Sequence, residues 1–303
     1  MKKYPKIRTV GHREVENLLP GEDIVVQEKI DGSNFTFGRD AGGELFCLSR
    51  NQKLSMADGA DNGMFNKAVA FVKSIADGVP LATLFRCEYL QSPKHGVINY
   101  SRVPLNNLVL FEVEGQNSYG DWVPATLIES GIEHYALKFG IEPVRFFHSG
   151  ELGLDGLIDS FDKWMQTESQ LGGTRPEGVV IKNRRAFTES GEMCRAKLVR
   201  QEFKEQMAHN KEAGKPNTVH ELGFRFGGKP RWQKAIQHLK EQGLIKGGPE
   251  DIGILMREIG RDVEEECIDE IKDALWKRFR KDVLSGAAQG FVDWYKKEIG
   301  LLQ

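Results

Sequence analysis

The chain of 303 residues has few cysteines, and they stand far apart at Cys47, Cys87, Cys194 and Cys267. Neither Cys-x-x-Cys spacing nor a disulfide-scaffold density occurs, so we expect reduced thiols in or near cores and no structural zinc. The sequence also lacks an apolar run long enough to span a bilayer, and its basic start lacks the apolar core of a signal peptide. These absences predict a cytoplasmic protein without membrane contact, and we expect a monomer.

Net charge is also small. The formal charge of −2 argues against a uniformly basic coat for nucleic acid and leaves a local basic groove as the way to hold a polyanion. The length suggests two domains, and the 40% hydrophobic content is enough to bury a core in each.

What the sequence does contain is a distinctive stretch from Val25 to Phe37. An apolar run, the turn dipeptide Asp31-Gly32 and alternating aromatic residues predict a hairpin of two short strands. Lys29 then stands at a strand end, next to Glu28. A free lysine is almost wholly protonated at neutral pH, so it becomes a nucleophile only if burial or neighbouring cations lower its pKa. By itself, Lys-x-Asp-Gly is a weak signal, because a surface lysine at a hairpin edge has the same pattern.

Alternating and periodic apolar residues predict the remaining elements of the first two thirds. Strands are expected around residues 7–10, 44–50, 82–90, 107–114, 141–147, from 179 and at 194–199. Helices are expected over residues 63–77, 123–139 and 154–168. This pattern predicts an α+β domain dominated by antiparallel sheet, which we assign to residues 1–214.

Beyond Phe203 no segment has the pattern of a strand. Residues 204–214 are polar and helical in character, and apolar residues then recur at four-residue intervals from Val263 to Val283. Glycines, among them Gly260 and Gly286, are interpreted as joints between helices. We therefore assign residues 215–303 to a small all-α domain.

Two later motifs strengthen the interpretation of Lys29 as a functional residue. The first is Pro176-Glu-Gly-Val-Val-Ile-Lys182, and the second is Cys194-Arg-Ala-Lys-Leu-Val199. In this order the three pieces resemble the covalent nucleotidyltransferases, the superfamily of polynucleotide ligases and capping enzymes. DNA ligases and capping enzymes append an oligonucleotide-binding β-barrel, for which no strands remain here. The whole chain instead resembles the RNA ligase 2 family, and the similarity continues through Leu244–Gly253 to Trp294.

The resemblance implies a fold with a ligase-type nucleotidyltransferase domain and a chemistry centred on Lys29. This lysine would attack the α-phosphate of ATP, forming lysyl-AMP and releasing pyrophosphate. Lys197 would be the cation on the α-phosphate. Glu177 would hold the hydration shell of Mg²⁺ or Mn²⁺.

The same resemblance implies a nucleotide-binding role for five more residues. Glu28 would lie at the adenine edge, Asn34 would engage the RNA end or metal-bound water, and Arg50 would bind a phosphate or ribose oxygen. Glu88 would accept from ribose hydroxyls and Phe111 would stack on adenine. Read without the resemblance, Glu28 is a solvated strand acid, Asn34 a turn residue, Arg50 a surface arginine and Phe111 a core residue.

One position departs from the family pattern, because Arg195 stands where many relatives carry a first lysine. The charge is kept, but an adaptable amine is replaced by a planar, permanently charged group. Arg195, Lys197 and a metal ion are expected to oppose protonation of Lys29 and so to lower its pKa. The basic run from Lys182 to Lys204 is suited to a phosphate backbone.

These observations predict an ATP-dependent polynucleotide ligase, an RNA ligase that seals 3′-hydroxyl to 5′-phosphate nicks through lysyl-AMP and an AMP-capped 5′ end. A ligase of DNA or mixed RNA/DNA nicks is the alternative, because the shared chemistry takes place at phosphates. From another class, a nucleic-acid-binding protein on a relic ligase fold is disfavoured by the joint presence of Lys29, Glu88, Glu177 and Lys197. We expect the helical region to clamp the polynucleotide.

Overall fold

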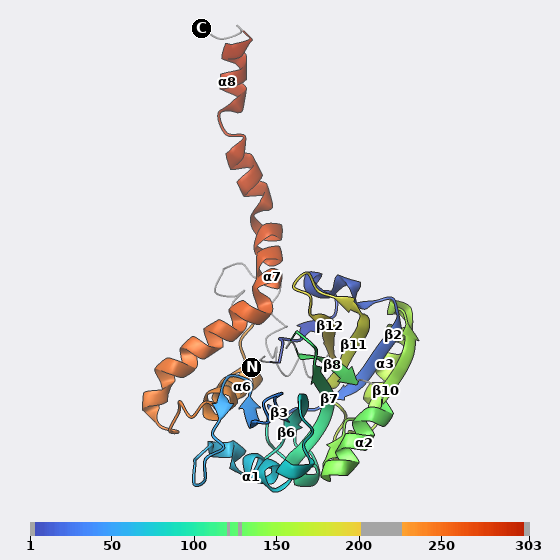
Figure 1. Cartoon of the computed structure of the whole chain (residues 1–303). Coiled ribbons are helices and arrows are strands. Elements are labelled where there is room, and N and C mark those ends of the chain that lie inside the picture. Colours follow the sequence, from blue (N-terminus) through green and yellow to red (C-terminus); the bar gives the residue numbers. More distant parts are fainter. Residues whose placement is uncertain (1–3, 120–121, 127–128, 201–225, 300–303) are drawn as a thin grey trace.

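The computed structural model describes residues 4–119, 122–126, 129–200 and 226–299. Figure 1 shows them as a body rich in sheet, joined to a helical extension. In the described part of residues 226–299 every regular element is a helix, so the expected α+β body and helical second region are confirmed. The predicted helix over residues 204–214 and the boundary at residue 214 lie outside the described residues.

The first sheet has five strands. In spatial order they are β1 (Arg8–Thr9), β12 (Met193–Val199), β11 (Gly178–Phe187), β2 (Gly21–Lys29) and β10 (Phe146–Leu152). All pairs are antiparallel except β1 with β12. Branched residues such as Ile24, Val26 and Ile181 are fully buried in its core, where their stiff side chains pack well on a pleated surface. The short η1 (Arg13–Leu18) and α3 (Leu154–Gln166) contribute Leu18 and Leu157 to this core.

The second sheet has seven strands. They are β5 (Lys53–Leu54), β4 (Leu45–Ser49), β3 (Ser33–Arg39), β6 (Thr83–Tyr89), β7 (Leu108–Gln116) and β8 (Trp122–Thr126), with β9 (Glu142–Pro143) beside β7. The helices that supply its core are η2 (Gly63–Phe65), α1 (Asn66–Ser74) and α2 (Glu129–Phe139), and two further short turns are η3 (Ala76–Gly78) and η4 (Leu105–Asn107). Phe37 and Phe85 stack at 5.0 Å between centroids, and each such buried ring stabilises the fold by roughly 2–3 kcal/mol.

The expected hairpin of β2 and β3 is wrong. β2 pairs with β11 and β10, whereas β3 pairs with β4 and β6, so the chain passes from one sheet to the other at residues 30–32. A Cβ added to Gly32 would lie 2.7 Å from the carbonyl oxygen of Tyr89. The glycine is therefore required by close backbone approach and not by a hairpin turn. As a result, Lys29 ends its strand at the junction of the two sheets.

Two other expectations need correction. The helix expected over residues 123–139 begins only at Glu129, because the preceding residues form β8. β8 pairs with β7 alone at the sheet edge, where a proline such as Pro124 is tolerated in a strand. Gly260 and Gly286 do not separate helices, since α7 (Ile252–Ala287) runs through both. An interior glycine costs a helix only about 1 kcal/mol.

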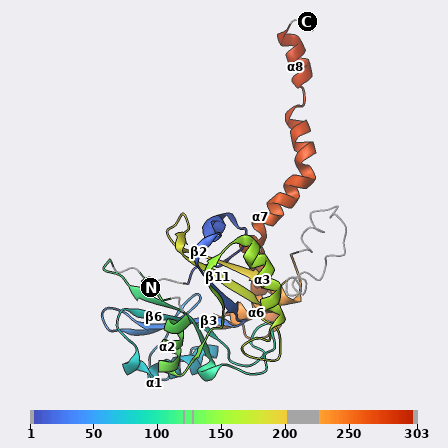
Figure 2. The same cartoon turned by 90° about the vertical axis from the view of Figure 1, so that its right-hand side faces the viewer.

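The helical region consists of α6 (Lys229–Glu241), η5 (Pro249–Asp251), α7 and α8 (Phe291–Glu298). Figures 1 and 2 show α6 and the first part of α7 beside the body, while the end of α7 and α8 extend away from it. Among the described helices, none combines the length and apolar character needed to cross a membrane. All four cysteines are buried and unpaired, as expected.

Candidate functional site

Lys29 lies where the two sheets meet, and its amine contacts a buried carboxylate. The last residue of β2 is paired in register with Gly178, the first residue of β11. Glu177, directly before that strand, therefore reaches the amine, with 2.7 Å between Lys29 Nζ and Glu177 Oε2. Strand pairing alone thus brings together two residues that are 148 positions apart in sequence.

The electrostatic surroundings of Lys29 are acidic. Burial by itself lowers the pKa of the amine, but the carboxylates of Glu177, Glu88 and Asp31 outweigh burial, and the pKa is raised above its ordinary value. The expectation that Arg195 and Lys197 lower this pKa is therefore wrong for the protein's own side chains, and the effect expected of a metal ion stays a prediction. The amine is held in its charged form by its acid neighbours.

The pKa values of the acids beside Lys29 are shifted as well. Burial raises the pKa of Glu88 to about 8; Lys29 opposes this shift, while Glu241, Glu177 and Asp31 add to it. Burial also raises the pKa of Glu177 despite its contact with Lys29. Burial is thus the main cause of both shifts, and the positive charge of Lys29 offsets only part of it.

Asp31 is fixed by the loop beside it. Its Oδ2 accepts hydrogen bonds from the backbone N–H groups of Val97 and Ile98, at 2.6 and 2.7 Å, and its own N–H donates to the hydroxyl of Tyr100 at 2.8 Å. Asp31 therefore organises the loop next to Lys29 and keeps the crossing between the sheets rigid.

Lys197 belongs to the same neighbourhood. Burial lowers its pKa, with Lys234 and Lys29 adding to the effect and Glu266 and Glu177 opposing it. Its Nζ lies 3.3 Å from Oε1 of Glu266 on α7. The structure thus places Lys197 within electrostatic reach of Lys29 and gives it a carboxylate partner from the helical region.

Arg195 makes a different contact. Its Nη2 lies 2.5 Å from Oε1 of Glu112, and Lys182 Nζ lies 2.9 Å from the other oxygen of the same carboxylate. Tyr4 donates its hydroxyl to Glu112 at 3.1 Å. Both cations and the acid are buried. Glu112 was missed, although an acid inside an apolar strand is costly without such partners, and this signal could have revealed it.

Glu28 and Phe111, which were expected to lie at the adenine of ATP, have different surroundings. Glu28 is buried, and its carboxylate accepts from Ser169 Oγ at 2.5 Å and from the Gln170 N–H at 3.1 Å. It is therefore not a solvated strand acid. Phe111 is half-buried, with its ring 5.3 Å from that of Tyr4 in an edge contact and 5.1 Å from Lys182 Nζ.

Asn34 and Arg50 lie on the other sheet. Asn34 is paired in register with Glu88, so it stands beside the acidic cluster. Arg50 is exposed directly after β4 and exerts its charge on Glu241 of α6. The predicted residues that meet around the amine are thus Lys29, Glu88, Glu177 and Lys197.

Comparison with protein families decides the classification. A family model described as RNA ligase matches residues 22–199, more than half of the chain. The chain belongs to the RNA ligase family. The match covers every predicted site residue, from Glu28 to Lys197, and supports a polynucleotide ligase. No curated protein matches the chain.

Among solved structures the likenesses are distant. An archaeal ATP-dependent RNA ligase is 14% identical with a TM-score of 0.46, over 94% of this chain and 74% of that one. A putative ATP-dependent DNA ligase from Aquifex aeolicus is 14% identical with a TM-score of 0.45, over 93% of this chain and 68% of that one. Naegleria gruberi RNA ligase with pyrophosphate is 16% identical with a TM-score of 0.45, over 70% of this chain and 60% of that one.

The helical region of this member of the RNA ligase family reaches the site directly, which sequence reasoning missed. Glu241 accepts a hydrogen bond from Ser33 Oγ, and Gln237 Nε2 donates to the carbonyl of Gly32 at 3.2 Å. Burial raises the pKa of Glu241 to about 7, against the hydrogen bonds from Ser33 and Gln237. Acids on a helix are ordinarily solvated, so nothing in the local sequence distinguishes Glu241 from an acid on the helix surface.

Within the described residues, no three His, Cys, Asp or Glu side chains form a ready-made metal cluster. The acidic surroundings of Lys29 nevertheless fit a hydrated divalent cation. Mg²⁺ retains several waters and commonly needs only one or two carboxylates. Glu177 and Glu88 are the acids that would hold it, because both lie beside Lys29 and carboxylate oxygens are ligands that Mg²⁺ prefers.

Proposed function

We propose that this protein is an ATP-dependent RNA ligase that seals 3′-hydroxyl to 5′-phosphate nicks through lysyl-AMP. One observation carries the proposal: Lys29, Glu88, Glu177 and Lys197, which come from distant segments, form one partly buried electrostatic cluster within the region that matches the RNA ligase family. A relic fold used only for binding has no need of a partly buried lysine with this set of neighbours.

The first step joins Lys29 to the nucleotide. Its Nζ attacks the α-phosphorus of ATP, the N–P bond forms, the bond to the pyrophosphate oxygen breaks, and pyrophosphate leaves. Lys197 balances the charge that develops on the α-phosphate oxygens. The amine must be neutral to attack, and the proton it gives up is the one directed at Glu177 Oε2.

The acid cluster explains why a divalent cation belongs in this step. When bound, Mg²⁺ or Mn²⁺ supplies the positive charge that the three carboxylates lack. Glu177 and Glu88 would hold this cation, and its charge would oppose protonation of the neighbouring Lys29 amine.

The later steps move AMP to the 5′-phosphate of the nick, after which the 3′-hydroxyl attacks and AMP leaves. RNA as the preferred substrate rests on the family match. A panel of nicked duplexes that differ only in ribose or deoxyribose on each side of the nick tests this preference. The monomeric state and the cytoplasmic location remain predictions from the sequence.

The decisive experiment is labelling of the protein with ATP that carries ³²P on the α-phosphate, in the presence of Mg²⁺ or Mn²⁺. We expect acid-labile AMP on the full chain, no label on Lys29→Ala, and normal labelling of Lys53→Ala. Lys53 is a suitable control because it is exposed and its ion pair with Glu44 lies on the surface. Retained label on Lys29→Ala would disprove the assignment of the nucleophile.

A further inference from the structure

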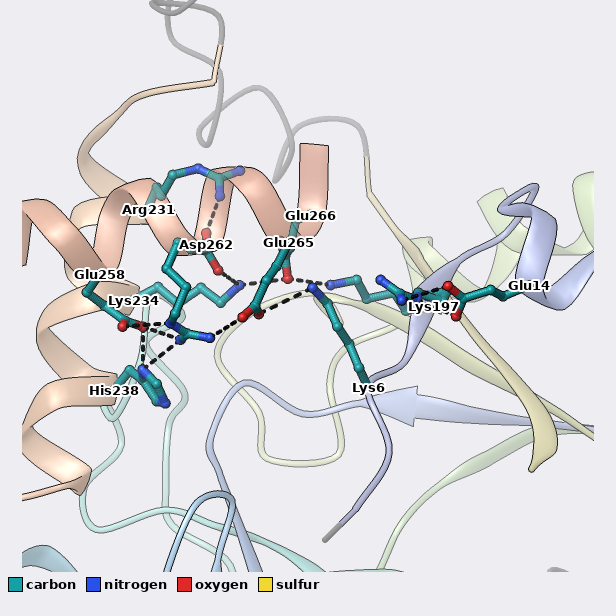
Figure 3. A network of polar contacts seen from close by, with 12 residues as sticks. Lys6, Glu14, Lys197, Arg231, Lys234, His238, Glu258, Asp262, Glu265 and Glu266 are labelled. Carbon is teal, nitrogen blue, oxygen red and sulfur yellow. Dashed lines mark hydrogen bonds and ion pairs between the residues drawn. The ribbon is translucent and has the colours of Figure 1, made fainter. Parts of the chain in front are cut away.

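One carboxylate oxygen of α7 lies between a lysine of the body and a lysine of α6. Oε1 of Glu266 lies 3.3 Å from Nζ of Lys197 on β12 and 2.9 Å from Nζ of Lys234 on α6. Figure 3 shows the two amines pointing toward this carboxylate from opposite sides. Two cations from two structural units are therefore separated by no more than one anionic oxygen.

Attachment of α7 does not explain why Lys197 takes part. Other pairs already join the same helix to its neighbours: Glu265 lies 3.5 Å from Lys6 Nζ, Asp269 lies 3.3 Å from His12 Nε2, and Asp262 contacts Arg231 and Lys234. Several of these are partly exposed pairs, which contribute little each, but they link α7 to the N-terminal segment and to α6 without Lys197. The contact of Glu266 with Lys197 is the one that involves a residue of the reaction site.

The geometry has the properties of an anion site. Ammonium groups bind carboxylate and phosphate oxygens through the same charge-assisted hydrogen bonds. A phosphate chain carries more negative charge than one carboxylate, so it competes well for two amines that already converge on one oxygen. Glu266 thus occupies the position that a phosphate oxygen would take beside Lys197.

We propose that Lys197 and Lys234 form one phosphate site across the body and the helical region, and that Glu266 fills this site while no phosphate is bound. The ligand class is the phosphate chain of ATP, including the pyrophosphate group that leaves. The identity of this ligand rests on the proposed function. The new elements are Lys234 as a phosphate-binding residue and Glu266 as its built-in competitor.

The test is calorimetric titration of the full-length chain with inorganic pyrophosphate, which requires no chemistry at Lys29. Glu266→Gln should bind pyrophosphate roughly tenfold more tightly, because the competing charge is removed. Glu265→Gln is the matched control: it removes the ion pair of α7 with Lys6 but leaves the anion on Lys197 in place. Equal tightening in both variants would show that loosened docking is the cause and would overturn the proposal, as would no tightening in Glu266→Gln.

The role of Lys234 is tested in the background of Glu266→Gln, where its contact with the competitor is already gone. Adding Lys234→Gln should weaken pyrophosphate binding by about tenfold, the effect of losing one charge-assisted contact. Lys240→Gln in the same background should not, because Lys240 is an exposed residue one and a half turns further along α6. Unchanged affinity after Lys234→Gln would refute the shared site.

These outcomes separate the site from the proposed function. If the variants bind pyrophosphate with the expected affinities but Lys29 takes up no AMP, the ligase proposal fails while the phosphate site stands. If AMP labelling succeeds and these affinities are not found, the site fails alone. Circular dichroism of each variant shows whether the chain is folded, so a loss of binding is interpreted only for folded protein.

Discussion

Glu112 offers the sharpest test of how the body is held together. Its carboxylate has no measurable exposure and contacts Arg195 at 2.5 Å and Lys182 at 2.9 Å, both of which are themselves buried. Glu112→Gln keeps the shape of the side chain but removes its charge. Two buried cations then face a neutral amide, and we expect the free energy of unfolding to fall by about 3–5 kcal/mol, as for other broken buried ion pairs.

The pH dependence follows from the direction of the Glu112 pKa. Burial raises this pKa, but Arg195 and Lys182 outweigh burial and hold it well below the ordinary value of 4.5. An acid whose pKa is lower in the folded state stabilises the fold above its ordinary pKa and loses that contribution as the pH falls. The difference between the wild type and Glu112→Gln should therefore be constant from pH 6 to 8 and shrink only in strong acid.

Urea unfolding followed by circular dichroism measures this difference, and Glu44→Gln provides the control. Glu44 forms an ion pair with Lys53 at 2.7 Å, but both side chains are more than half exposed, so its loss should cost less than about 1 kcal/mol. Similar, small effects of Glu112→Gln and Glu44→Gln would refute the view that Arg195 is primarily held by a buried ion network.

Three further predictions concern the reaction site and the helical region. Lys197→Ala should reduce the rate of AMP attachment by on the order of a hundredfold, whereas Arg195→Lys should lower stability and leave the rate of folded protein nearly unchanged; equal, small rate effects would mean that β12 is wrongly assigned. The pKa of Glu241 is raised from 4.5 to about 7 in the folded protein, so between these pH values the folded chain keeps a proton that the unfolded chain has lost, and stability falls as the pH rises. Glu241→Gln should make this fall smaller in melting temperatures measured from pH 5 to 8. A fragment of residues 1–214 should fold on its own cores and form lysyl-AMP but seal nicks poorly, and sealing as fast as the intact chain would refute the clamp function of the helical region.

The sequence predicted most of the fold because its strands and helices have regular periods. The β6–β7 pair and the apolar face of α1 are examples. The expected hairpin of β2 and β3 failed for a specific reason. Asp31-Gly32 is typical of a tight turn, but here the glycine serves close approach to Tyr89 and the aspartate binds a loop. Local turn preference cannot distinguish these uses, since both require a small residue and a carboxylate.

The pKa of Lys29 was misjudged because sequence order does not give distance. Arg195 and Lys197 are two residues apart and share a strand face, so both were expected beside the amine. In the structure Arg195 is engaged by Glu112, while Lys29 is surrounded by Glu177, Glu88 and Asp31. Which acid neutralises which cation is decided by packing between the sheets, and a motif specifies only that the charges are present.

Buried and exposed acids differ in how well a sequence reveals them. Glu88 and Glu112 stand inside apolar strands, where an unpaired carboxylate is costly, so their positions alone demand partners. Glu266 lies on a long helix rich in charged residues, where an acid ordinarily faces solvent at no cost, yet it contacts Lys197. A substitution at Glu266, which has the pattern of a surface residue, should therefore act on phosphate binding, whereas one at Arg195, inside a motif, should act first on stability.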